Sequence, residues 1–106
     1  MTRDEFMRRI ELIATNCVEI CRKKNSDYAA SSDAFANFRA AAQEAGISVE
    51  QVIRARMGEK NKRMLNLLNQ PNQVEHETIL DTLDDMANFA MILRVWLEVQ
   101  REASSD

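Results

Sequence analysis

The scarcity of turn-forming residues is the strongest constraint on the fold of this chain. Its 106 residues include only two glycines, Gly46 and Gly58, and one proline, Pro71. Strands that follow one another through tight turns need glycine where φ is positive, and glycine or proline between successive strands. Methionine, alanine and leucine, whose side chains suit a helix, are abundant instead. We therefore predict an all-α fold.

Hydrophobic spacing divides the chain into four expected helices within one domain, residues 1–106, because a chain of this length has room for one core. The expected helices span about 3–24, 33–45, 48–69 and 75–101. The capping-box patterns Thr2-Arg3-Asp4-Glu5 and Ser48-Val49-Glu50-Gln51 open the first and the third. Residues 25–32 are polar and small, which predicts a loop. We expect a compact four-helix domain.

Net charge, hydropathy and cysteine placement indicate a cytoplasmic protein. The 14 basic and 17 acidic residues give a formal net charge of -3, which argues against a nucleic-acid partner because duplex-binding modules carry a basic excess. No apolar run approaches the roughly 20 residues of a membrane span, so we expect no membrane partner. Cys17 and Cys21 share the apolar face of one helix, where we expect buried thiols instead of a disulfide or a zinc site.

The fourth expected helix has two faces of different character. At roughly 100° per residue, one face carries Asp81, Asp84, Asp85 and Asn88, and we name the three aspartates the acidic cluster. The other face is expected to form the core, with Leu80, Leu83, Met86, Ala87, Ala90, Leu93 and Leu97. In the C-terminal half the first side also becomes apolar, with Ile92, Val95, Trp96 and Val99. We expect a neighbouring helix or a second subunit to cover that side, in a homodimer or homotetramer.

The acidic cluster must be offset by positive charge, because like charges at helical neighbour spacing repel one another. Two arrangements would do this. In the first, Arg56 and Arg63 of the third expected helix form salt bridges with the cluster, and nothing is bound. In the second, Glu59 joins the cluster around Mg²⁺ or Mn²⁺, since hard cations prefer carboxylate oxygens. The basic residues of the third helix then face an anionic ligand.

Four separate blocks of the sequence, taken in order, carry a family resemblance. They are Lys24-Asn25-Ser26-Asp27-Tyr28, Asp33-Ala34-Phe35-Ala36-Asn37-Phe38-Arg39, Arg56-Met57-Gly58-Glu59-Lys60 and Asp81-Thr82-Leu83-Asp84-Asp85-Met86-Ala87-Asn88-Phe89. Together they resemble the first type of nucleotide modification associated domain, a small family of largely bacteriophage and prophage origin. The resemblance covers about residues 24–93. It implies a role in nucleotide metabolism, in the cytoplasm of a bacterial host.

The last two blocks also resemble, more remotely, the all-α nucleoside triphosphate pyrophosphohydrolases of the MazG-like kind. That resemblance implies a MazG-like bundle completed by self-association, with Mg²⁺ activating water for attack between the α and β phosphates. Asp81 and Asp84 can stand for the second of the two metal-binding pairs of that family, although a different alignment puts Asp85 in the last position. The first pair lacks a carboxylate, because only Glu59 is present, and Asp27 is the candidate replacement.

The two resemblances, together with the helix faces, give a set of expected ligand contacts. The phosphate- and nucleotide-binding candidates are Lys24, Asp27, Tyr28, Asn37, Arg39, Arg56, Lys60, Arg63 and Asn88. Phe35 and Phe38 either stack on a base or pack in the core, and Asn37 either reads a base edge or caps a helix. The sole histidine, His76, is expected in an exposed connection and not as a general base. No catalytic residue is assigned.

The sequence thus predicts a divalent-metal-dependent nucleotide-binding protein that hydrolyses the pyrophosphate linkage of a nucleoside triphosphate. The alternative is a non-catalytic phage accessory protein. Such a protein would act as a nucleotide sensor, or would inhibit a host factor by protein–protein contact.

Overall fold

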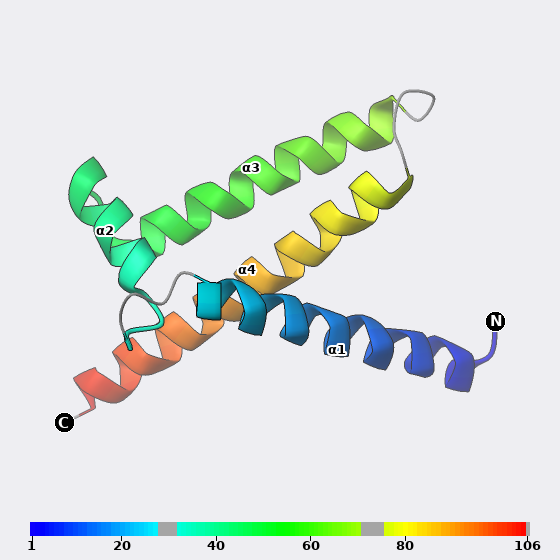
Figure 1. The fold of residues 1–106 in the computed structure, drawn as a ribbon, viewed down its shortest axis with the longest axis horizontal. Helices are drawn as coiled ribbons and strands as arrows, with labels where there is room; N and C mark the ends of the chain where they lie inside the picture. Colours follow the sequence, from blue (N-terminus) through cyan, green and yellow to red (C-terminus); the bar gives the residue numbers. More distant parts are fainter. Residues whose placement is uncertain (28–31, 71–75, 106) are drawn as a thin grey trace.

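The computed structural model, which describes residues 1–27, 32–70 and 76–105, is all-α as predicted. Its helices are α1 (Arg3–Asp27), α2 (Ala36–Ala45), α3 (Val49–Asn69) and α4 (His76–Ser104). Figure 1 shows α3 and α4 side by side, α2 at one end of this pair, and α1 crossing α4. Within the described ranges, no helix is long and apolar enough to cross a membrane.

The helix boundaries differ from the expected ones in three places. α1 continues to Asp27, through residues expected in the loop, because neither glycine nor proline interrupts it. α2 begins at Ala36 instead of near 33, since Asp33 closes a turn there: its carboxylate accepts from the Phe35 N–H at 3.0 Å, and its carbonyl from the Ala36 N–H at 3.1 Å. α4 runs to Ser104, beyond the expected end near 101.

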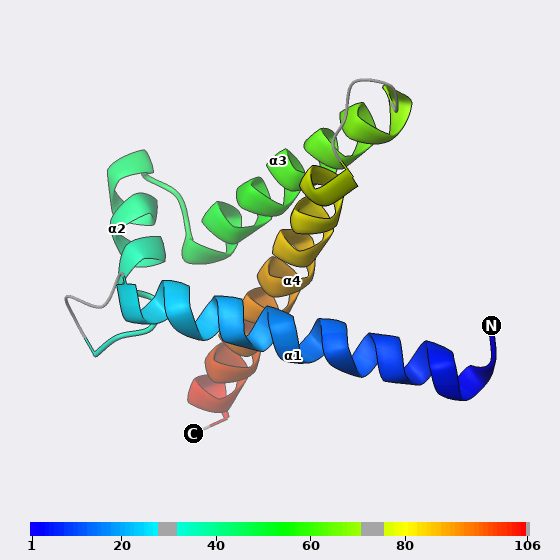
Figure 2. The same ribbon diagram turned by 45° about the vertical axis from the view of Figure 1, so that its right-hand side comes forward.

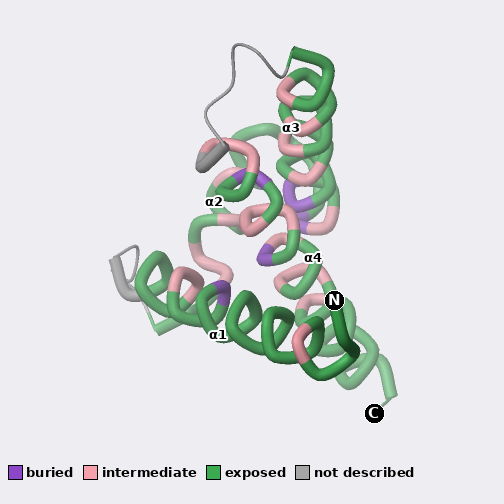
Figure 3. Tube along the Cα trace, turned by 90° about the vertical axis from the view of Figure 1, so that its right-hand side faces the viewer, coloured by how far each residue is buried: buried purple, intermediate pink, exposed green. Residues whose placement is uncertain are grey.

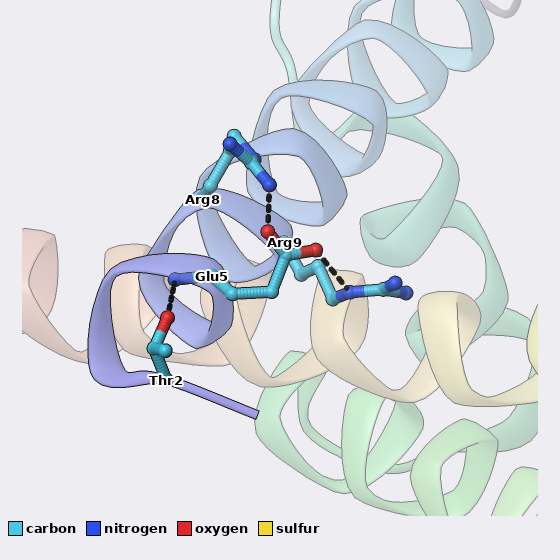
Figure 4. A network of polar contacts seen from close by, with 4 residues as sticks. All are labelled: Thr2, Glu5, Arg8 and Arg9. Atoms are coloured by element: carbon cyan, nitrogen blue, oxygen red, sulfur yellow. Dashed lines mark hydrogen bonds and ion pairs between the residues drawn. The ribbon is translucent and has the colours of Figure 1, made fainter.

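The expected capping pattern at the start of α1 is half formed. The Glu5 N–H donates to the Thr2 hydroxyl at 3.1 Å, as a capping box requires. The Glu5 carboxylate instead contacts the guanidinium groups of Arg8 and Arg9, one turn further along (Figure 4). The two arginines are exposed and Glu5 is only half-buried, so these ion pairs contribute little to stability.

The turn between α2 and α3 is fixed by local hydrogen bonds on both sides. Gly46 ends α2 in the left-handed region, with φ of 69°, and the Ile47 N–H reaches the Ala42 carbonyl at 3.0 Å. The predicted capping box opens α3: the Gln51 N–H donates to the Ser48 hydroxyl at 3.1 Å, and the Ser48 N–H donates to the Gln51 side chain at 2.9 Å. The entry into α3 is therefore set by residues within four positions.

Replacing Ser48 with alanine should lower the free energy of unfolding by about 1 kcal/mol, because it removes the acceptor for the Gln51 N–H. Urea denaturation followed by circular dichroism measures the loss. The control is Ser104→Ala, since the Ser104 hydroxyl donates only to the Gln100 carbonyl near the frayed end of α4. Equal losses in the two variants would mean that the capping box does not stabilise α3.

The core is small and lies where α2, α3 and the C-terminal half of α4 meet. Ile53 is fully buried, with 0% of its surface exposed. The buried residues around it are Ala42, Val49 and Val52, and the partly buried side chains packed against them are Phe35, Phe38, Ala41, Met57, Ile92, Leu93 and Trp96. Phe35 and Phe38 thus pack in the core. Few positions along the trace are buried, as Figure 3 shows.

The face of α4 that is buried is not the one that was predicted to form the core. Leu80 and Leu83, expected in the core, are 45% and 41% exposed, and Ala87, Ala90 and Leu97 are exposed as well. Of the expected core face, only Met86 and Leu93 are half-buried. The reason is that α1 and α3 pack against the polar side of α4, which turns much of the apolar stripe outward.

Two of the residues expected to need a second subunit are covered within the chain. The Trp96 ring lies edge-on to the Phe35 ring, with centroids 5.0 Å apart, and the Arg39 guanidinium sits 5.0 Å from the Trp96 ring. Ile92 packs against the same core. Val95 and Val99 remain exposed.

The chain is not compact, contrary to expectation. Its radius of gyration is 16.2 Å, whereas a compact chain of this length has about 13 Å. Figures 1 and 2 show the cause: the N-terminal half of α1 projects away from the α3/α4 pair. Much of the apolar face of α1 is therefore uncovered.

Candidate functional site

Asp85 lies where α1, α3 and α4 meet, between lysines from two other helices. The Lys60 Nζ of α3 is 2.9 Å from its Oδ2, and the Lys24 Nζ of α1 is 3.5 Å from its Oδ1. The Lys60 and Asp85 side chains are only 31% and 23% exposed, so water screens their interaction less than it screens a surface pair. We name this convergence the three-helix junction.

Cys17 of α1 faces the acidic cluster at the same junction. Burial raises the pKa of the Cys17 thiol, and the charge of Asp84, a hydrogen bond to Asp84 and the charge of Asp85 raise it further. The protonated thiol can therefore donate to the Asp84 carboxylate. A thiol with a raised pKa is a poor nucleophile, so its role is structural. Both cysteines are free thiols; Cys17 is buried, as expected, whereas Cys21 is only half-buried.

Asn88 is the most unusual polar residue of the junction. It lies one turn beyond Asp84 and Asp85 on α4, and only 7% of it is exposed. Its Oδ1 is buried and accepts no hydrogen bond from any residue that the structure describes. Leaving such an acceptor unsatisfied costs about 1–3 kcal/mol. Thr82, also buried, has satisfied its hydroxyl by donating to the Thr78 carbonyl at 2.9 Å. The Asn88 Oδ1 is thus available to accept a hydrogen bond or to coordinate a cation.

The structure brings some predicted site residues together and leaves others apart. Those at the three-helix junction are Lys24, Lys60, Asp84, Asp85 and Asn88. Asp81, Glu59, Arg56 and Arg63 are exposed. In the described part of the chain, no group of three or more His, Cys, Asp or Glu side chains is arranged to hold a metal ion. The predicted arginine salt bridges are wrong, because lysines pair with the cluster instead.

Of the other residues predicted to contact a ligand, some lie on α2 and others lie outside the residues that the structure describes. Asn37 is exposed in the first turn of α2. Arg39 is engaged within the chain, with its Nε 2.8 Å from the Asp33 Oδ2 and its guanidinium on Trp96. Tyr28 and the side chains of Asp27 and His76 lie outside the described residues.

Sequence reasoning missed the part that Cys17 plays at the junction. The signal was present, because Cys17 and Lys24 are seven residues apart and so occupy one face of α1. Since Lys24 pairs with a carboxylate of α4, the face of α1 that carries Cys17 and Lys24 must pack against α4. Thr82 was missed as well, since nothing in its sequence neighbourhood distinguishes a buried threonine from an exposed one.

An apolar groove runs along α3 and α4 on the side of α4 that faces away from α1. Its first part has a volume of about 490 Å³, and its lining residues are Met57, Gly58, Asn61, Met86, Ala87 and Ala90. A second part of about 370 Å³ shares Met57 and Ala90 with the first, so the two are continuous, but its lining also includes the charged residues Arg94, Glu98 and Arg101. We name the whole the α3/α4 groove. Neither protein-family models nor curated proteins nor solved structures match this chain.

Proposed function

We propose that the three-helix junction binds the phosphates of a nucleotide together with Mg²⁺ or Mn²⁺. The observation that carries this proposal is the convergence of Lys24 and Lys60, from separate helices, on Asp85 beside the unsatisfied Asn88. Lysine binds phosphate as a mobile point charge, whereas carboxylate and amide oxygens suit a hard cation. The junction holds both kinds of group side by side.

The donor set fits a cation that arrives with its nucleotide. Mg²⁺ in nucleotide sites keeps several waters and is held by one or two carboxylates plus the substrate phosphates, so a closed protein cage is not required. Asp84 and Asp85 would hold it, with Asp81 and Glu59 at the open rim, and the Asn88 Oδ1 would gain its missing partner directly or through water. Lys24 and Lys60 would then release Asp85 and turn to the phosphates.

We further propose that the bound nucleoside triphosphate is hydrolysed at its pyrophosphate linkage, as the resemblance to the nucleotide modification associated domain and to MazG-like enzymes implies. A divalent cation supplies an activated water and polarises the phosphoryl group. The chain itself contributes binding and orientation: the lysines neutralise phosphate charge, and the Cys17 thiol stays protonated and does not compete as a nucleophile. Cytoplasmic nucleotide metabolism remains the expected setting.

A second candidate function is favoured by a different observation. The exposed apolar surface on α1 and the α3/α4 groove is typical of proteins that act by contact with other chains. A non-catalytic accessory protein, acting as a nucleotide sensor or as an inhibitor of a host factor, would use such a surface without hydrolysing nucleotide. Self-association, which would complete the bundle, uses the same surface.

A panel of natural and modified deoxynucleoside triphosphates with millimolar Mg²⁺ tests the proposal. We expect at least one to release pyrophosphate and to raise the melting temperature, since a ligand at 100 times its Kd stabilises the folded state by about 2.7 kcal/mol. The double substitution of Asp84 and Asp85 with asparagine should abolish both effects. The control Glu102→Gln, which removes an exposed charge from the same helix, should preserve them.

Two results would decide against this function. If a nucleotide raises the melting temperature without being hydrolysed, the protein is a sensor. If no nucleotide binds and the double variant merely changes metal-free stability, the junction is a structural ion pair.

A further inference from the structure

We infer that two copies of this chain form a dimer in which the N-terminal half of each α1 lies in the α3/α4 groove of the other copy. The occupant of the groove is thus a second copy of the chain. This inference is independent of the proposed nucleotide site, because the groove lies on the other side of α4 from the three-helix junction.

The first of the two surfaces is an uncovered apolar stripe on α1. Phe6, Met7, Ile10 and Ile13 are each roughly half-exposed. Their positions continue the face that carries the buried Cys17 further along the helix. The stripe belongs to the N-terminal half of α1, which projects past α4 in Figures 1 and 2. The same helical face is therefore packed at one end and exposed to solvent at the other.

The second surface is the α3/α4 groove, and Gly58 shows that it is shaped for a close neighbour. Glycine in the interior of a helix is destabilising relative to alanine, so its presence requires a reason. No atom of the described chain lies within 4 Å of the position that a Cβ at Gly58 would occupy, apart from its own helix and chain neighbours. Ala87 and Ala90 line the same groove with side chains that are only one methyl group larger. No atom of the described residues fills this space, so a docked helix has room to approach α3 closely at Gly58.

The accessible area of the molecule leaves room for a second copy. Its accessible surface is 8366 Å², whereas a compact monomer of 12.2 kDa has about 6,000 Å². The excess exceeds the roughly 800 Å² that each partner buries in an interface of standard size. A chain that exposes this much more surface than its mass predicts has room for one large interface.

The two surfaces cannot meet within one molecule. The ion pair of Lys24 with Asp85 places α1 on the side of α4 that carries Asp84 and Asp85, while the groove opens on another side, at Ala87 and Ala90. A stripe and a groove at separate places on one molecule close into a dimer only when a two-fold axis relates the two copies, so that each stripe fills the groove of the other copy. One second copy covers both at once, in a closed dimer with two identical contacts.

Sedimentation velocity at micromolar concentrations tests the dimer. Wild type should sediment at twice the 12.2 kDa chain mass. Ile10→Glu, in the stripe, and Ala90→Arg, in the groove, should each give folded monomers, because both side chains are exposed within one chain. The matched control is Leu12→Glu, an exposed residue on the other side of α1, which should remain dimeric. Circular dichroism should give the same helix content for all four proteins.

Mixing the two monomeric variants makes the test specific. A pair formed from one Ile10→Glu chain and one Ala90→Arg chain keeps one intact contact, between the normal stripe and the normal groove. The mixture should therefore show a higher average mass than either variant alone. A monomeric wild type, a dimeric Ala90→Arg variant, or a mixture with no gain in mass would each overturn the inference.

Discussion

Replacing Ile53 with alanine should lower the free energy of unfolding by about 3 kcal/mol and the melting temperature by roughly 15 °C. Ile53 is the most deeply buried apolar side chain, and the cluster around it is small. The cavity left by the substitution cannot be filled easily, because Ala42, Val49 and Val52 are short side chains on fixed helices. Urea denaturation at one fixed protein concentration measures the loss.

The same substitution at Ile47 provides a matched control. Ile47 precedes α3 and is 40% exposed, so its loss should cost less than about 1 kcal/mol. Similar losses at the two positions would show that the core does not centre on Ile53.

Replacing Trp96 with glutamate should unfold the protein instead of merely dissociating it. The indole packs edge-on against Phe35 and lies beside the Arg39 guanidinium, at 5.0 Å in each case. Truncating a core tryptophan costs about 3–5 kcal/mol, and the new carboxylate would lie against the Phe35 ring, while Arg39 is already paired with Asp33. Loss of the far-ultraviolet helical signal at room temperature is the expected result.

The neighbouring residue Val95 supplies the control, since it is 48% exposed on another side of α4. Val95→Glu should keep its helix content and its mass in solution. A Trp96→Glu variant that stays folded but loses its partner would place Trp96 in the interface instead of the core.

The sequence predicted the helices and the caps well because these depend on nearby residues. Ser48, Gln51 and Gly46 set the α2–α3 turn through hydrogen bonds within a few positions of the chain. The packed face of α4 was not predictable in the same way. Leu83 and Trp96 lie on different sides of a helix that is apolar almost all round, and the choice between them depends on where α1 and α3 pack.

Only part of the candidate site could be predicted from the sequence, because the pairing of its charges also depends on how the helices pack. Lys60 reaches Asp85 because it lies seven residues after Ile53, on the buried side of α3, whereas Arg56 and Arg63 point further into solvent. The rotation of α3 about its axis decides which basic residue meets the carboxylate. That rotation follows from the burial of Ile53, which a charge pattern alone does not reveal.

The projecting half of α1 should be less stable than the half that is packed at the three-helix junction. An isolated helix of that length is marginal in water, so in a lone copy it depends on its own backbone hydrogen bonds and on its junction with the anchored half. Its amide hydrogens should exchange with solvent readily, while those near Cys17 are protected. In the proposed dimer, completion of this helix would depend on protein concentration, because the second copy would cover its apolar stripe.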